Sequence, residues 1–249
     1  MLTDAELDRY ARQIILPAFG GAGQAKLKSA HVAVIGAGGI GCPAITYLAA
    51  AGVGRLTIID DDVVELSNLQ RQPLFTDADI GAAKAVVAAE AARRINLHVE
   101  AVAVPSRLDD GNATTLLRGA DLILDGCDNF ATRLTVNRAA VALQIPLLSA
   151  AIGAFEGQVA LYEGWRGGSP CYACLVGDDP NQEGINCAET GVMGALAGMI
   201  GTMAALEAVR ALTGWGSALT GRLAIVDMLD RRWREVAVAK DRECPICRG

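Results

Sequence analysis

Histidine is scarce in this chain, with only His31 and His98 among 249 residues. Two histidines argue against a serine–histidine hydrolase and against a metal site built from several imidazoles. Basic residues are outnumbered, because 22 Lys and Arg stand against 28 Asp and Glu, for a formal net charge of −6. Nucleic-acid binders need a basic stripe to meet the phosphates, so this balance predicts no nucleic-acid partner.

Charged residues are also few, at 20%, whereas apolar residues make up 52%, a composition that excludes a disordered chain. The N-terminal residues lack the basic-then-apolar pattern of a secretory signal. The most apolar stretch, residues 191–209, is interrupted by glycines, Thr202 and Glu207, whereas a membrane span needs about 20 mostly apolar residues. We therefore expect a soluble, cytoplasmic protein without membrane contact, whose seven cysteines are reduced, ligate a metal or act in catalysis.

Short apolar runs alternate with alanine-rich helical patterns through the first 150 residues. Strands are expected at 32–35, 56–59, 99–104, 122–124 and from about 146, and helices at 43–51, 81–95, 108–117 and 130–143. This alternation predicts an α/β fold with a doubly wound, mostly parallel sheet that is covered on both faces. Residues 1–30 are expected to form a helical arm with a turn at 20–23.

The pattern changes beyond residue 153, where an antiparallel extension of the sheet is expected. Its parts are a strand at 158–162, a polar loop at 171–186, a long helix at 191–212, and a hairpin of 223–226 with 233–238. We expect a single domain over residues 1–249 with no sharp internal boundary. Within it, residues 31–150 form a nucleotide-binding core and residues 151–249 a second half.

A glycine-rich loop follows the first strand. Its glycines, which match G-x-G-x-x-G, are Gly36, Gly38, Gly39 and Gly41. A helix follows, and Asp60 ends the next strand, 19 residues after the last glycine. Glycines let the backbone approach a phosphate at a helix N-terminus, and an aspartate at that strand end can bind ribose hydroxyls. This context predicts a nucleotide site; the alternative is that the glycines only allow close packing of strand and helix.

The polar loop after Asp60 argues against NAD as the nucleotide. It carries Ser67, Asn68, Gln70 and Arg71, and Lys84 follows on the next helix. Arg71 and Lys84 together are typical of a clamp for a triphosphate. Alternatively, they belong to a solvated loop and a helix surface.

The end of the fourth strand carries a second polar group, Asp128 and Asn129. Ligands of doubly wound sheets collect at the carboxyl ends of the strands. Asp128 is a candidate Mg²⁺ ligand, because magnesium is held by one or two carboxylates together with phosphates. The alternative is a helix N-cap, a position that Asp and Asn favour; the two roles are compatible.

Four of the cysteines form two C-x-x-C pairs, Cys171 with Cys174 and Cys244 with Cys247. Four thiolates suit a closed tetrahedral Zn²⁺ site, which would join the C-terminus to the loop near residue 171. A redox pair is the alternative, but it explains one pair and leaves the other. The site is expected to be structural.

The three remaining cysteines differ in their surroundings. Cys42 and Cys127 are expected to be small buried residues. Cys187 lies in a polar loop before the long helix, where a helix N-terminus lowers a thiol pKa and makes the thiolate nucleophilic. Cys187 is therefore a candidate nucleophile.

Together these motifs resemble the MoeB/ThiF family of ubiquitin-activating-type adenylyltransferases. The segments that carry the resemblance are 9–13, 36–41, 49–54, 67–72, 128–130 with Arg133, both C-x-x-C pairs, and 191–194 with 201–207. The resemblance implies ATP-dependent adenylation of the C-terminal Gly-Gly carboxylate of a ubiquitin-like sulfur-carrier protein, with release of pyrophosphate. A thiocarboxylate then forms from a sulfur donor such as a cysteine desulfurase or rhodanese, in molybdopterin or thiamine synthesis.

The resemblance also implies roles for individual residues. Gly39, Asp60 and Asp62 would lie at the nucleotide, with Asp60 on the ribose, and residues 67–71 with Lys84 would line the phosphates. Asp128 would hold Mg²⁺. Arg12 would reach into the site of the partner subunit, which makes a homodimer necessary.

Three questions stay open at this point. Cys187 takes part in an acyl-enzyme or persulfide step in some family members and is dispensable in others. The carrier and its pathway are not specified by the sequence. The competing functions are an NAD-dependent Rossmann oxidoreductase, suggested by the glycine loop alone, and a scaffold that binds a carrier without activating it.

Overall fold

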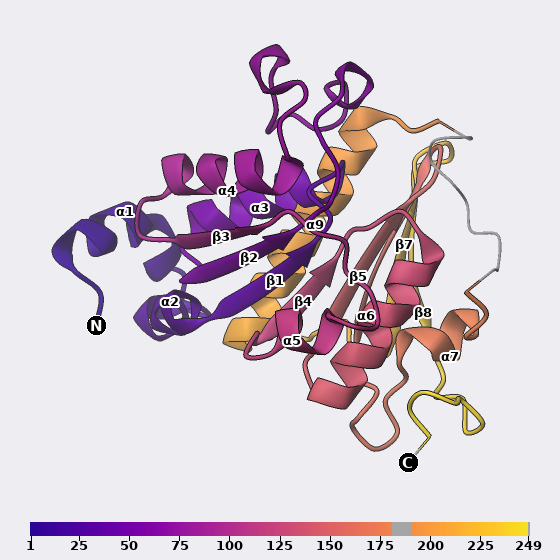
Figure 1. The fold of residues 1–249 in the computed structure, drawn as a ribbon. Helices are drawn as coiled ribbons and strands as arrows, with labels where there is room; N and C mark the ends of the chain where they lie inside the picture. Colours follow the sequence, from indigo (N-terminus) through magenta and orange to yellow (C-terminus); the bar gives the residue numbers. More distant parts are fainter. Residues whose placement is uncertain (181–190, 249) are drawn as a thin grey trace.

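A computed structural model describes residues 1–180 and 191–248 (Figure 1). Its central feature is one mixed sheet with the strand order β3-β2-β1-β4-β5-β6-β7-β8. The strands are β1 His31–Ile35, β2 Arg55–Ile59, β3 Glu100–Val104, β4 Leu122–Asp125, β5 Leu147–Ile152, β6 Glu156–Tyr162, β7 Arg222–Asp227 and β8 Arg232–Ala237. The first five pair in parallel and the last three extend the sheet in antiparallel. The predicted doubly wound sheet and its antiparallel extension are confirmed.

Helices cover both faces of this sheet (Figure 1). They are α1 Asp4–Ile14, α2 Gly20–Ser29, α3 Gly41–Ala51, α4 Lys84–Ile95, α5 Ala113–Leu117, α6 Phe130–Leu143, α7 Tyr172–Val176 and α9 Gly194–Thr213. One apolar core joins α3, α4 and α9 to the sheet, and a second joins α5 and α6 to the other face. Along β1, Val32 and Val34 belong to the first core, and Ala33 and Ile35 to the second. A strand buried on both faces explains the continuous apolar run in the sequence.

Helix α9 is, among the described residues, the one helix long and apolar enough by length and composition to cross a membrane. In this fold it packs against α3, β5 and β6. The fit to α3 is close, since a Cβ on Gly201 would lie 2.3 Å from the carbonyl oxygen of Ile40. The small residues of α9 therefore serve close packing of a helix in the core.

Several helix boundaries differ from the sequence prediction: α4 begins at Lys84, α9 begins at Gly194, and the two largest differences are at α2 and α5. Residues 20–23 begin helix α2 and do not form a separate turn. The helix expected at 108–117 is limited to Ala113–Leu117. The cause is Asp109, whose Oδ1 accepts hydrogen bonds from the backbone N–H groups of Gly111 and Asn112. Such a side-chain turn competes with helical hydrogen bonding.

The polar loop expected at 171–186 also contains structure, because α7 spans Tyr172–Val176. Cys171 precedes this helix and Cys174 lies within it. The short helix therefore sets the spacing of the first cysteine pair. In Figure 1 the C-terminal segment lies beside α7, which brings the second pair to the first.

Candidate nucleotide-binding cleft

A cleft of about 720 Å³ opens at the carboxyl ends of the parallel strands. Strands β1 and β4 are neighbours there, and the chain leaves them for helices on opposite faces of the sheet. Such a switch point is where doubly wound sheets bind their ligands. Most residues predicted for the site line this cleft: Gly36, Gly38, Gly39, Asp60, Asp62, Asn68, Arg71, Lys84, Asp128 and Asn129.

Three residues predicted to bind the nucleotide lie outside the cleft lining. Gly41 begins α3 and packs on the glycine loop, where a Cβ would lie 1.9 Å from the carbonyl oxygen of Gly36. Ser67 is exposed and its hydroxyl donates to Glu65. Gln70 is exposed, and its backbone touches the first residue of α9, Gly194. These contacts place Gly41 and Gln70 in the packing around the loops.

The carboxylate of Asp60 is hydrogen-bonded to the glycine loop. Its Oδ2 accepts a hydrogen bond of 2.7 Å from the N–H of Ala37, and its Oδ1 accepts one of 2.9 Å from the N–H of Asp62. Burial raises the pKa of the Asp60 carboxyl above its ordinary value, and the two N–H donors partly oppose that rise. Asp60 therefore links the two loops that form the cleft floor.

Both predicted cations reach the cleft, in different electrostatic settings. The ammonium of Lys84 is nearly buried and forms an ion pair of 2.9 Å with Asp62, whose side chain is mostly exposed. Arg71 is half-buried and donates to the carbonyl oxygen of Ser67 at 2.9 Å. Among the described residues Arg71 has no carboxylate partner within ion-pair distance. Arg71 thus supplies positive charge that no neighbouring carboxylate neutralises.

The loop after β4 presents Asp128 at the cleft, where this side chain is exposed. Asn129 caps α6, since its Oδ1 accepts from the N–H of Thr132 at 2.8 Å. The N-cap considered as the alternative role of Asp128 is thus occupied by its neighbour Asn129, which is the N-cap of α6. In the described part of the chain Asp128 has no ion-pair partner, so its carboxylate is available to a cation.

Several polar residues that line the cleft are not among those predicted from the sequence, and two of them, Gln72 and Arg133, are buried. Gln72 is only 3% exposed, and its Oε1 has no hydrogen-bond partner among the described residues. Arg133 is also buried and lines the cleft from beneath the loop of Asp128. Both stand within motifs that carried the family resemblance. The motifs therefore indicated that both residues could belong to the site, but a motif match does not reveal their burial or their hydrogen-bond partners.

Arg12 is not among the residues that line this cleft. Helix α1 packs near the amino-terminal start of β3, where Asn96 donates to the Tyr10 hydroxyl at 2.7 Å. In Figure 1 it lies at the far left, beyond β2 and β3 from β4. Arg12 is exposed on that helix. Cys187 lies outside the described residues.

The four paired cysteines come together beside α7. The Sγ–Sγ distances are 3.9 Å for Cys171–Cys174, 3.6 Å for Cys171–Cys244 and 3.4 Å for Cys174–Cys247, and all four sulfur atoms lie within 4.8 Å of one another. A tetrahedral Zn²⁺ with bonds of about 2.3 Å sets its sulfurs about 3.8 Å apart. The cluster is thus compatible with zinc.

Burial raises the thiol pKa of the two other cysteines that the structure describes, Cys42 and Cys127. Burial raises the pKa of Cys42 to about 12, and Cys42 is buried as the sequence predicts. Cys127 is half-buried at the cleft, and burial also raises the pKa of its thiol well above the usual value. Neither environment activates a thiolate.

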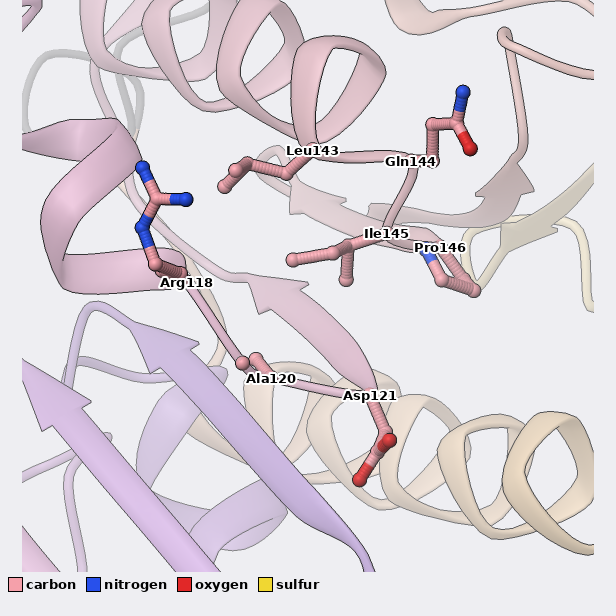
Figure 2. Close-up of a pocket in the computed structure, with 8 residues that line it drawn as sticks. Arg118, Ala120, Asp121, Leu143, Gln144, Ile145 and Pro146 are labelled. Atoms are coloured by element: carbon pink, nitrogen blue, oxygen red, sulfur yellow. The ribbon is translucent and has the colours of Figure 1, made fainter.

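A second, smaller hollow of about 430 Å³ lies at the opposite edge of the sheet. Figure 2 shows its lining, which includes Arg118, Asp121, Gln144 and Pro146. These residues precede β4 and β5, so they lie at the amino-terminal ends of the strands. No residue that the sequence predicts for a site lies there, and the larger cleft remains the candidate site.

Comparison with known proteins identifies close relatives. Residues 10–246 match the ThiF family. The sulfur carrier protein adenylyltransferase of Thermus thermophilus is 45% identical over 251 residues, which cover 98% of this chain and 92% of that protein. The molybdopterin-synthase adenylyltransferase of Escherichia coli is 41% identical over 246 residues, covering 99% and 98%. The adenylyltransferase and sulfurtransferase MOCS3 of Mus musculus is 45% identical, but this chain spans only 54% of it.

The fold also matches solved structures. Escherichia coli MccB, crystallised with MccA-N7isoASN, superposes with a TM-score of 0.85 at 22% identity, covering 98% of this chain and 75% of that one. The same enzyme with ATP gives a TM-score of 0.84. At such low identity these matches show the fold alone. The family match and the identity to the relatives, both over nearly the whole chain, show that this protein belongs to the ThiF family.

Proposed function

We propose that this protein is an adenylyltransferase that activates the C-terminal carboxylate of a ubiquitin-like sulfur-carrier protein with ATP. The names of its relatives support this activity. The observation that carries the proposal is the cleft itself, which gathers the glycine loop, Arg71, Lys84 and Asp128 at one switch point. Hydride transfer with NAD requires no magnesium ligand, so the exposed carboxylate of Asp128 beside two cations favours adenylyl transfer over an oxidoreductase.

In the proposed reaction a carboxylate oxygen of the carrier attacks the α-phosphorus of ATP. A new C–O–P linkage forms, and the bond from the α-phosphorus to the bridging oxygen breaks, so that pyrophosphate leaves with that electron pair. Carboxylate and triphosphate repel each other, and the site must therefore supply positive charge and alignment. Arg71, Lys84 and the N-terminus of α3 supply it here.

Asp128 fits the role of a magnesium ligand. Its carboxylate is exposed at the cleft, and oxygen is the ligand atom that Mg²⁺ prefers. When bound, Mg²⁺ would neutralise phosphate charge and help the pyrophosphate to leave. Gln72, with its unpaired Oε1 beside the glycine loop, offers a further polar contact to the nucleotide.

The cleft continues beyond Asp128 along the end of β5, where Ala151, Ile152 and Gly153 line it. Ala151 and Gly153 have little or no side chain, which leaves room for an extended chain to approach the α-phosphate. This composition supports a Gly-Gly tail as the second substrate. The carrier body would stay outside the cleft.

We propose further features that the sequence resemblance implied. The protein acts as a homodimer in which Arg12 serves the cleft of the partner subunit, because Arg12 does not line the cleft of its own chain. The four-cysteine cluster holds structural Zn²⁺. Residues 1–30, 31–150 and 151–249 serve as arm, nucleotide core and carrier-binding half of one cytoplasmic enzyme that works with a separate sulfur donor.

The test is exchange of labelled pyrophosphate into ATP with purified carriers of molybdopterin and thiamine synthesis in turn. We expect exchange with at least one carrier, and none when its terminal glycine is removed. Asp128→Ala should abolish exchange while the protein stays folded by circular dichroism. Failure of every intact carrier would contradict the activity, and full exchange by Asp128→Ala would contradict the role of that carboxylate.

A further inference from the structure

Arg133 is a buried cation whose position is unfavourable for folding. Its side chain is only 8% exposed, in the first turn of α6. Positive charge is disfavoured at a helix N-terminus, where the helix dipole is itself positive. Burying a charged pair also carries a desolvation cost, and apolar replacements of such pairs are often neutral or stabilising. Stability alone therefore does not account for an arginine at this position.

The guanidinium of Arg133 binds the loop after β4 and the neighbouring strand β5. Its Nη2 donates to the carbonyl oxygens of Cys127 and Ala150, the latter at 2.8 Å, and its Nη1 donates to the Ser149 hydroxyl at 3.0 Å. Its Nη1 also lies 3.5 Å from Oδ2 of Asp125, a carboxylate that is 1% exposed. One side chain thus ties the loop to β4 and β5.

The same group of contacts fixes the residue that precedes Asp128. Cys127 is held at both ends, because its carbonyl oxygen accepts from Arg133 and its N–H donates to Oδ1 of Asp125 at 3.0 Å. A peptide unit is planar, so the carbonyl carbon and oxygen of Cys127 share one rigid plane with the nitrogen and Cα of Asp128. The orientation of this plane therefore fixes the position of the Asp128 backbone nitrogen and Cα relative to the cleft.

We propose that Arg133 is a positioning residue for adenylation, which fixes the Cys127–Asp128 peptide so that the Asp128 carboxylate is directed into the nucleotide cleft. This inference rests on the proposed function of the cleft. Arg133 acts through Asp128 and touches no reacting atom. A displacement of a reacting group by about 1 Å can lower a rate about 100-fold.

The decisive experiment is a double-mutant cycle of Arg133→Lys and Asp128→Asn, measured by carrier-dependent pyrophosphate exchange. Lysine keeps a charge beside Asp125, and the buried carboxylate therefore stays paired, but it cannot bind Cys127, Ser149 and Ala150 together. We expect Arg133→Lys to lower kcat about 100-fold while the KM for ATP changes less than about threefold. The double variant should be no slower than Asp128→Asn alone, because the two residues act as one unit.

The control is Arg138→Lys on the same helix. Arg138 is half-buried, pairs with Asp110 at 2.8 Å and does not line the cleft. We expect the control to keep wild-type kcat. A merely structural role of Arg133 predicts that its loss multiplies with the loss from Asp128→Asn, or that kcat per folded molecule is unchanged; either result overturns the proposal.

A second measurement separates this proposal from the proposed function. Binding of Mn²⁺ to the protein–ATP complex can be followed by electron paramagnetic resonance without any carrier. We expect Arg133→Lys to weaken Mn²⁺ binding about tenfold and Arg138→Lys to leave it unchanged. If Arg133→Lys also leaves it unchanged, the positioning role is wrong. If Mn²⁺ binding shifts as expected but no carrier supports exchange, the carrier activity alone has failed.

Discussion

Replacement of Asp60 by the isosteric asparagine should weaken ATP binding without lowering the stability of the fold. The carboxylate accepts hydrogen bonds from the N–H groups of Ala37 and Asp62, which belong to the two loops beside the cleft. In Asp60→Asn one of these N–H groups would face the amide nitrogen, which is a donor too. The glycine loop then loses one of the contacts that hold it in place.

The expected magnitude follows from these contacts. The family resemblance places Asp60 on the ribose of the nucleotide, and a hydrogen bond to a charged group contributes about 1.5–3 kcal/mol. Loss of about 2 kcal/mol at that contact corresponds to an ATP Kd about 30-fold higher. Stability should respond in the opposite direction. Burial raises the pKa of Asp60, so the folded state favours the neutral form, and ionisation of Asp60 costs stability as the pH rises through the raised pKa. At neutral pH the uncharged asparagine should therefore keep or raise the melting temperature.

Calorimetric titration with Mg-ATP, together with thermal unfolding at pH 7, measures both effects. Asp77→Asn is the charge-matched control, because Asp77 is exposed and does not line the cleft. Weaker ATP binding at an unchanged or higher melting temperature supports the reasoning. A lower melting temperature with unchanged ATP affinity would refute it.

Three further predictions concern the rest of the fold. Lys28 lowers the pKa of Glu6 to about 2 through an ion pair of 2.7 Å. This pair should therefore stabilise the protein above pH 4.5 and lose that contribution as the pH falls toward 2. Glu6→Gln should make the loss of stability with falling pH less steep in that range. Gly201→Ala should destabilise by about 1–3 kcal/mol in urea, because its Cβ would meet the carbonyl of Ile40, and an unchanged midpoint would contradict the packing. Cys247→Ser should lose bound zinc by atomic absorption and melt at a lower temperature; full zinc retention would exclude Cys247 as a ligand.

The fold was predictable from local patterns because each strand and helix carries its own signal. The apolar runs at β1 and β2, the glycines between β1 and α3, and the long uninterrupted pattern of α6 all match the structure. The exceptions arose where side chains compete with the backbone, as at Asp109, whose turn delays α5. Glycines at 20–23 suggested a turn, but Gly23 fits inside a helix because its missing Cβ leaves room for the Phe19 ring.

The residue types of the candidate site could be predicted from the sequence, whereas the contacts between their side chains could not. Strand ends that meet at one edge bring Asp60 and Asp128 to the same cleft, and the topology alone is enough to predict this. Pairings between distant side chains leave no local signal. Examples are the contact of Lys84 with Asp62 and the burial of Arg133 beneath the loop of Asp128.

Adenylation proceeds by attack of a carrier carboxylate on the α-phosphate, and an isotope experiment tests this step directly. The carrier is labelled with ¹⁸O at its terminal carboxylate, mixed with ATP and this protein, and the acyl-adenylate is released by sulfide. The account predicts pyrophosphate and AMP that carries one ¹⁸O from the carrier, measured by mass spectrometry. Formation of ADP, or of AMP without the label, would contradict it.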